Sequence, residues 1–292
     1  MLNIVRTLII SLFWFMSCPL HADPGKAMEA YQNGKFKLAY KEFKKSALKG
    51  HADSQYNLAV MLYSGKGVPK DKAEAVYWFI QSAEGGDQSA QYNLGVLYSS
   101  DKELPNEYPK MENGEIYFEV SSRKPETNKA KAVKWYKMAA EKGHISAQLN
   151  LGVIFNQGIG VKKDYKEAAK WYQKAADQGN SKAQLNLGIL YDLGRGVTKD
   201  AAKAQDNYKK AAMKGIRDAQ YNLGIIYYNG DSGIKQNYIE SYAWLALAKE
   251  QGSELAAIYK DKVERKIKGS EKKKAKKLAI AYYRKYLKPF MK

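Results

Sequence analysis

One nine-residue segment recurs five times along the chain, and this repetition limits the possible folds more than any other feature. The shared leucine of the segment falls at positions 58, 94, 151, 187 and 223, so the steps are 36, 57, 36 and 36 residues. A unit of 36 residues therefore repeats, with 21 extra residues inserted once (57 − 36 = 21). A fixed period in this range is typical of a solenoid, in which each unit buries its apolar face against its neighbours. The copies are SQYNLAVML (54–62), AQYNLGVLY (90–98), AQLNLGVIF (147–155), AQLNLGILY (183–191) and AQYNLGIIY (219–227).

The repeated segment predicts the first of two helices in each unit. Its apolar residues, such as Ala183, Leu187 and Leu190, recur at steps of three and four, which is the spacing of one helical face. Glycine is costly inside a helix, so the glycines of this segment predict close contact between neighbouring helices. They stand at Gly95, Gly152, Gly188 and Gly224. The helix is expected to end at GKGV, GIGV or GRGV, where glycine adopts the left-handed conformation.

A second helix is expected to follow in each unit. DKAE (71–74), DYKE (164–167) and NYIE (237–240) have the capping-box arrangement, with Asp or Asn three residues before Glu. A column of large side chains then recurs, and a glycine closes each helix. The column is Phe43, Phe79, Tyr136, Tyr172, Tyr208 and Leu245, and the closing glycines are Gly50, Gly86, Gly143, Gly179, Gly215 and Gly252.

The combined pattern AxxNLGxLYxxGxGVxKDxxKAxxWYxKAAxxG resembles the Sel-1-like repeat, a variant of the tetratricopeptide repeat, over about 52–252. Residues 25–50 resemble an ordinary tetratricopeptide unit. The resemblance implies an all-α fold, a right-handed solenoid of about six helix pairs. We therefore expect a repeat domain over 23–252 and basic capping helices over 253–292.

The first 22 residues have the layout of a secretory signal peptide. A positive amino-terminal region precedes the apolar run TLIISLFWFM, and a small residue, Ala22, stands before the expected cleavage site. The run is shorter than the roughly 20 residues that a membrane-spanning helix needs. We therefore expect a periplasmic or secreted protein. Cys18 offers a lipoprotein as the alternative, and because it is the only cysteine, a chain cleaved at Ala22 would contain no thiol.

The formal net charge of +19 is concentrated near the carboxyl end. Residues 260–292 contain 14 Lys and Arg against three acids, an excess of +11. A solubilising cap is the first interpretation, because the terminal unit of a solenoid needs a face that tolerates water. Attraction to anionic lipid headgroups or another acidic envelope polymer is the second. Nucleic acid is disfavoured as the partner of an exported protein.

No catalytic constellation, metal site or cofactor site is predicted. Of three histidines, His21 belongs to the signal peptide, and His51 and His144 occupy the same turn in different repeats. Matches to SxxK are expected by chance in so lysine-rich a chain, and the KTG and SDN motifs of penicillin-recognising enzymes are absent. Some cysteine-rich relatives are linked to penicillin binding, and this chain lacks their cysteines. A penicillin-binding or β-lactamase-like hydrolase is therefore the weaker alternative.

One asparagine recurs in every copy of the repeated segment. We call these residues the asparagine column: Asn57, Asn93, Asn150, Asn186 and Asn222. The resemblance implies that the first helices line a concave groove with this position facing into it. A carboxamide both donates and accepts hydrogen bonds, which suits the backbone of an extended peptide. The other interpretation is that each asparagine satisfies an adjacent repeat. If the asparagine column binds a peptide, neighbouring side chains would add selectivity for the sequence of that peptide, above all Tyr56, Tyr92 and Tyr221.

The 21-residue insertion lies within 99–127, between the two helices of one pair. This segment has seven acids and four bases in an otherwise basic protein. EIYFEV alternates enough to predict a strand in a small hairpin. Insertions on a repeat scaffold often lie on the binding face, although a tolerated surface loop is the other interpretation. We expect a partner contact through Tyr108, Tyr117 and Phe118.

These features predict a non-enzymatic scaffold of the bacterial envelope that binds another protein or an extended peptide. What the resemblance implies includes envelope scaffolds, host-interaction factors and periplasmic immunity proteins that neutralise secreted toxins. The sequence does not choose among these.

Overall fold

The computed structural model describes residues 25–100, 104, 108–112, 115–118, 127–230 and 233–290. The predicted signal peptide, with Cys18, lies outside the described residues. The chain divides into two compact units, Met1–Ala147 with Ile159–Val161 and Gln148–Gly158 with Lys162–Lys292. Within the described ranges, no helix combines the length and the apolar character needed to cross a membrane.

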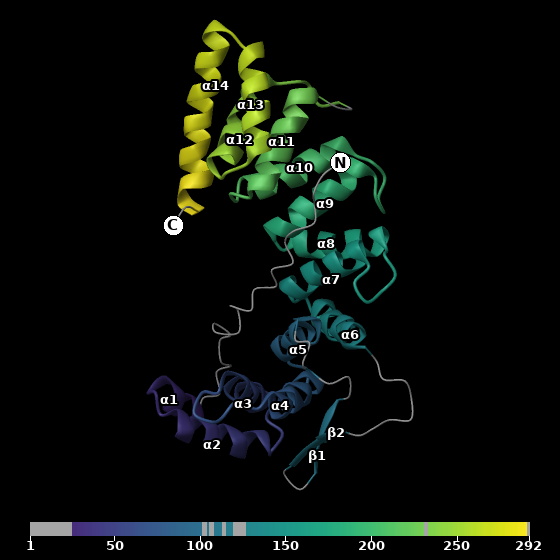
Figure 1. Ribbon diagram of the computed structural model, residues 1–292, viewed down its shortest axis with the longest axis vertical. Helices are drawn as coiled ribbons and strands as arrows, with labels where there is room; N and C mark the ends of the chain where they lie inside the picture. Colours follow the sequence, from purple (N-terminus) through teal and green to yellow (C-terminus); the bar gives the residue numbers. More distant parts are fainter. Residues whose placement is uncertain are drawn as a thin grey trace. The chain divides into compact units, whose positions relative to one another are not determined.

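Helices follow one another in pairs along the described chain, as the sequence predicts (Figure 1). The first unit contains α1 (Lys26–Gln32), α2 (Phe36–Ala47), α3 (Ala52–Ser64), α4 (Lys72–Glu84), α5 (Gln88–Ser100) and α6 (Asn128–Glu141). The boundary falls within α7 (Ile145–Gln157). The second unit continues with α8 (Tyr165–Asp177), α9 (Ser181–Leu193), α10 (Ala201–Ala212), α11 (Arg217–Asn229), α12 (Tyr238–Glu250), α13 (Glu254–Lys266) and α14 (Gly269–Tyr282). The predicted all-α solenoid of six helix pairs with capping helices is confirmed.

The glycines inside the first helices contact the large side chains of the second helices. The ring of Tyr172 in α8 packs on Gly152 of α7, where an added Cβ would lie 2.3 Å from Cδ1 of the ring. Tyr136 on Gly95, Tyr208 on Gly188 and Leu245 on Gly224 repeat this arrangement. Tyr172 is buried, so the ring is held in place by its surroundings. The predicted close contact between helices is therefore confirmed.

The ends of the helices also follow the sequence. Gly65 after α3 has a φ of 72° and Gly194 after α9 has a φ of 63°, so both adopt the left-handed conformation. Asp71 accepts a hydrogen bond from the backbone N–H of Glu74 at the start of α4. The Glu74 carboxylate accepts a hydrogen bond from the indole N–H of Trp78 at 3.2 Å. This glutamate therefore also fixes an aromatic side chain.

The insertion contains the predicted hairpin. Strands β1 (Pro109–Glu112) and β2 (Glu115–Phe118) pair antiparallel, with Lys110 opposite Tyr117. Both strands contact α4, although in sequence they stand between α5 and α6 (Figure 1).

A buried lysine lies beside the residue that leads into this hairpin. Lys131 of α6 is 1% exposed, and its ammonium lies 3.8 Å from the ring centroid of Tyr108 and 4.9 Å from that of Tyr98. Burying a charge is costly, and aromatic faces attract cations. Three other repeats have glutamate at the position of Lys131, namely Glu74, Glu167 and Glu240. The lysine and the tyrosine of the insertion therefore form an internal contact specific to this repeat.

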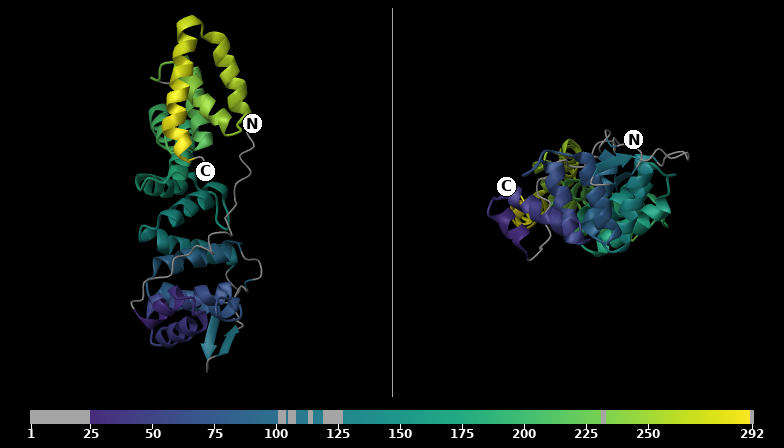
Figure 2. Two further views of the ribbon diagram at one scale, coloured as in Figure 1. Left: turned by 90° about the vertical axis from the view of Figure 1, so that its left-hand side faces the viewer. Right: turned by 90° about the horizontal axis from the view of Figure 1, so that it is seen from below.

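The last helices cap the second unit, as predicted. Both α13 and α14 pack against α12, and Figure 2 shows α14 beside the other helices of this unit. The Glu264 carboxylate of α13 accepts hydrogen bonds from Lys272 of α14 and from Lys260, at 2.8 and 3.1 Å. These two contacts, first that with Lys272, lower the pKa of Glu264 to about 2. An ionised Glu264 thus holds α13 to α14.

Candidate protein-binding surfaces

The first two residues of the asparagine column are buried. Asn57 and Asn93 are 0% and 4% exposed. The side-chain amide of Asn93 donates a hydrogen bond to the hydroxyl of Tyr56 at 3.1 Å, and Tyr56 is itself buried. A partner cannot reach these three side chains in this structure. Their predicted exposure to a groove is therefore corrected, because neighbouring side chains of this unit bury them and Asn93 bonds to Tyr56.

The rest of the asparagine column is half-buried. The side chain of Asn186 lies beside the hydroxyl of Tyr172, and that of Asn222 beside the hydroxyl of Tyr208, where each asparagine partly offsets the burial that raises the pKa of the tyrosine. In both cases the tyrosine belongs to the second helix of the preceding pair. The pair before Asn93 has Phe79 at this position, which has no hydroxyl, and Tyr56 takes over the contact. These contacts support the structural interpretation of the column. A binding role for Asn150, Asn186 and Asn222 stays a prediction.

In the second unit, apolar side chains beside the asparagine column pack between successive helix pairs. Leu185 and Ile189 of α9 pack against the core formed by α10 and α11. Tyr221 and Ile225 of α11 pack against the core of α12 and α13. These side chains are half-buried, so only part of each remains available to a partner.

Tyrosines from three helices meet around Tyr221. We call this group the tyrosine patch: Tyr221 and Tyr228 of α11, Tyr238 of α12 and Tyr259 of α13. All four are half-buried. The ring centroid of Tyr259 lies 6.2 Å from that of Tyr221 and 5.6 Å from that of Tyr228, which in turn lies 5.9 Å from Tyr238.

Two lysines lie over the tyrosine patch. The ammonium of Lys262 is 4.5 Å from the ring centroid of Tyr259, and that of Lys266 is 5.5 Å from the ring centroid of Tyr238. Both lysines are exposed. Of the predicted site residues, only Tyr221 belongs to this patch. The periodicity could not identify the other tyrosines of the patch. Tyr228 occupies a position that holds Asn156 and Asp192 in other repeats, and Tyr259 belongs to the cap, which has no repeat pattern.

Tyr92 has a local partner in the first unit. Its ring stacks on the imidazole of His144, with centroids 4.4 Å apart and planes 20° from parallel. Nδ1 of His144 accepts a hydrogen bond from the backbone N–H of Ala147 at 3.2 Å, so this histidine caps α7. This contact confirms the interpretation of His144 as a turn residue. Burial lowers the pKa of His144 below its ordinary 6.5, and the nearby Asp87 partly offsets this effect.

His144 is expected to make stability depend on pH. Because its pKa is lower in the folded than in the unfolded protein, protonation favours unfolding, and it also removes the acceptor at Nδ1. The stabilisation by the neutral His144 cap should be complete above pH ~6.5 and lost as the pH falls through the lowered pKa, and losing a helix cap of this kind costs about 1 kcal/mol. Urea unfolding at pH 7.5 and pH 5.5 measures this change in the free energy of unfolding. His144→Asn, which copies the cap made by Asn180 on α9, should remove this pH dependence, and equal pH dependence in both proteins would contradict it.

The insertion presents one of its three predicted contact residues. Tyr117 on β2 is 40% exposed. Tyr108 is half-buried against Lys131, so the structure gives it an internal role instead of the exposed position expected from the sequence. The side chain of Phe118 lies outside the described part of the chain. Contact of a partner with Tyr117 stays a prediction.

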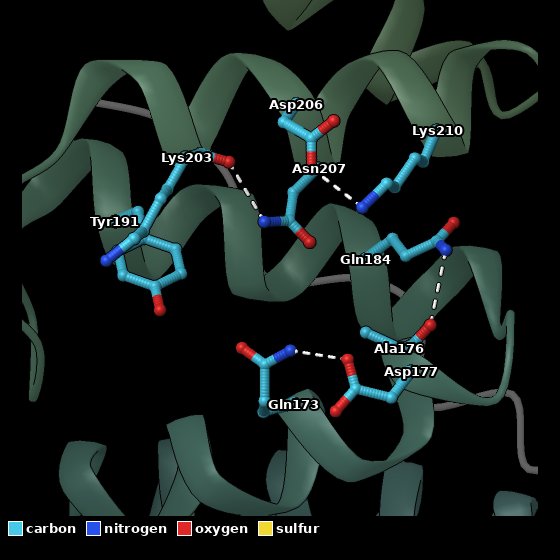
Figure 3. Close-up of a pocket in the computed structure, with 9 residues that line it drawn as sticks. All are labelled: Gln173, Ala176, Asp177, Gln184, Tyr191, Lys203, Asp206, Asn207 and Lys210. Atoms are coloured by element: carbon cyan, nitrogen blue, oxygen red, sulfur yellow. Dashed lines mark hydrogen bonds and ion pairs between the residues drawn. The ribbon is translucent and has the colours of Figure 1, made fainter.

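A polar pocket of about 220 Å³ lies where α8, α9 and α10 meet. Figure 3 shows Gln173 of α8 and Asn207 of α10 reaching into it from opposite sides. Its polar groups mostly bind one another: Gln173 donates to Asp177 at 2.7 Å, and Lys210 pairs with Asp206 at 2.7 Å. Sites for small organic ligands are mostly apolar, so this pocket does not suit one. Among the residues that the structure describes, no three His, Cys, Asp or Glu side chains gather as metal ligands would.

Comparison with known proteins agrees with the repeated helix pairs of this chain. The profile of the Sel1 repeat matches residues 52–87, 88–106, 122–144, 145–180, 181–216 and 217–253. A solved Sel1 repeat protein from Oxalobacter formigenes is 29% identical with a TM-score of 0.64, over 79% of this chain and 86% of that one. The protein c5321, a protective antigen of uropathogenic Escherichia coli strains, is 26% identical with a TM-score of 0.50, over 94% of this chain and 64% of that one.

A curated relative shares part of the repeat region. DAP3-binding cell death enhancer 1 from Rattus norvegicus is 30% identical over 155 residues, which is 48% of this chain and 30% of that protein. The chain thus matches less than a third of the length of this relative. The Sel1 profile covers more than half of the chain, and its second and third matches lie on either side of the hairpin. The protein therefore belongs to the Sel1 repeat family.

Proposed function

We propose that this chain is a non-enzymatic scaffold that binds another protein, and that the tyrosine patch carries the contact. Proteins with Sel1 repeats are in general non-catalytic scaffolds for protein interaction, and no enzymatic family is indicated. The observation that supports the patch is the gathering of four half-buried tyrosines and two exposed lysines on α11, α12 and α13. Tyrosine is enriched at the energetic centres of protein interfaces.

The chemistry of the patch indicates what a partner would present. Tyrosine offers a large apolar ring and a polar hydroxyl, and it loses little conformational entropy when it is bound. Lys262 and Lys266 add positive charge at the edge. A segment with apolar side chains flanked by Asp or Glu would complement both.

The cellular setting belongs to the same proposal. The layout of residues 1–22 supports export to the periplasm or beyond, with cleavage near Ala22 or, as the alternative, lipidation at Cys18. Neutralising a secreted toxin would be one form of this binding. A penicillin-directed hydrolase gains no support, since the family is in general non-catalytic.

The test has two steps. A photo-crosslinking amino acid at position 228 should capture one protein in the envelope of the source cells, while the same group at Asn207 on α10 should not. With that protein purified, Tyr228→Ala should weaken binding at least ~5-fold, because truncating a central interface tyrosine costs about 1 kcal/mol or more. Lys210→Ala, on the polar pocket, serves as the matched surface variant and should change the Kd less than ~2-fold. An unchanged Kd for Tyr228→Ala, with circular dichroism showing intact helices, would exclude the patch.

A further inference from the structure

Helix α14 has one face against the protein and one face in water. Its inner face contributes the buried Ala275 and the ring of Tyr282, which lies 4.6 Å from the Trp244 ring of α12. The outer face contributes Lys273, Lys277 and Ile280, and Arg284 follows in the π-helical turn Tyr283–Leu287 that continues α14; we call these four residues the basic strip. They are spaced by four, three and four residues, and Lys273, Lys277 and Ile280 share one side of α14. All four are exposed, including Ile280 at 55%.

The charges of the basic strip are not neutralised within the part of the chain that the structure describes. Lys260 and Lys272 pair with Glu264, whereas Lys273, Lys277 and Arg284 form no ion pair with any described residue. Across 254–290 there are 13 Lys and Arg against four acids, an excess of +9. Such a concentration of one sign creates a field that attracts anionic surfaces.

The composition of the strip favours a lipid surface over an acidic protein. Centres of protein interfaces are depleted in lysine, whereas three of the four residues of the basic strip are lysine or arginine. An anionic bilayer attracts basic residues without a fixed geometry, and each one near the surface adds to binding. An exposed isoleucine among the bases can enter the boundary between headgroups and acyl chains.

We propose that the basic strip docks α14 on a bilayer that contains anionic phospholipids. The site is separate from the tyrosine patch and does not depend on the proposed protein partner. The apolar residues of this segment divide accordingly: Leu287 and Tyr282 face the protein, whereas Ile280 faces outward.

Cosedimentation with vesicles tests the proposal, using a chain that begins at Asp23 so that the apolar run at 7–16 cannot contribute. At ~50 mM NaCl the protein should bind vesicles of phosphatidylcholine with ~30% phosphatidylglycerol, and not vesicles of phosphatidylcholine alone. Binding should be largely lost at ~500 mM NaCl, where charges are screened within a few ångström. The triple variant Lys273→Glu, Lys277→Glu and Arg284→Glu should reduce the partition coefficient at least ~100-fold.

A matched variant tests whether vesicle binding depends on the charges of the basic strip or only on the net charge of the protein. Lys182→Glu, Lys209→Glu and Lys214→Glu reverse three exposed lysines of the same unit that form no ion pair with a described residue, and should cost less than ~10-fold. The corresponding glutamine variants of the strip exclude misfolding as the cause if circular dichroism is unchanged. Ile280→Ser should weaken binding ~5-fold and leave its salt dependence intact. Equal loss in both triple variants, or stronger binding to soluble polyglutamate than to the vesicles, would overturn the proposal.

Discussion

Replacing Gly152 with alanine is expected to lower the free energy of unfolding by about 3 kcal/mol. The added Cβ would lie 2.3 Å from Cδ1 and 2.4 Å from Cε1 of Tyr172, distances that carbon atoms do not tolerate. The ring is buried, so the two helices must separate to make room. Alanine has the better helix propensity by about 1 kcal/mol, so any loss of stability comes from packing. Urea unfolding followed by circular dichroism measures it.

Gly85 provides the matched control for this substitution. It has an ordinary helical φ of −67°, and an added Cβ would approach no atom closer than 3.3 Å. Gly85→Ala should therefore change stability by less than ~0.5 kcal/mol. Combining Gly152→Ala with Tyr172→Ala should cost less than the sum of the single changes, because the second removes the atoms that the first strikes. If Gly152→Ala were as stable as Gly85→Ala, the packing of Tyr172 on Gly152 would not stabilise the pair formed by α7 and α8.

Tyr108→Ala is expected to destabilise the first unit by about 3 kcal/mol. The substitution removes the ring whose centroid lies 3.8 Å from the ammonium of Lys131, which is almost completely buried. The ring of Tyr98, whose centroid lies 4.9 Å from the ammonium, is more distant and would compensate only in part. Thermal unfolding should show the loss.

Two further variants separate the ring from the other parts of this contact. Tyr108→Phe keeps the aromatic face and should keep most of the stability. Lys131→Met in the Tyr108→Ala background removes the buried charge and should restore at least ~1 kcal/mol. Equal losses for Tyr108→Ala and Tyr108→Phe would assign the effect to the hydroxyl and not to the ring.

Contacts that repeat with the period of the chain could be predicted from the sequence. The glycines at 95, 152, 188 and 224 predict close packing, and each receives the side chain of the recurring large residue. The caps at Asp71 and Asp164 and the left-handed Gly65 follow from local backbone chemistry. The hairpin in the insertion follows from its alternating residues.

Contacts that break the period could not be predicted in this way. The asparagine column is a clear case, because its position recurs while its environment changes from buried Asn57 to half-buried Asn222. Tyr108 lies within the insertion and Lys131 on the helix that follows it, and no spacing rule relates a lysine on a helix to a ring beside a strand. The tyrosine patch joins α11 to the cap, which has no repeat pattern.

The order of helices, their pairing and the seams between successive pairs were thus contained in the amino-acid sequence of this protein. They depend on each unit and its nearest neighbours, and a repeated pattern records such contacts directly. The position of the insertion against Lys131, the grouping of the tyrosines and the outward side of α14 required the folded structure. These features join residues from unlike segments, and only the packing of the whole unit determines which side chains meet and which remain in water.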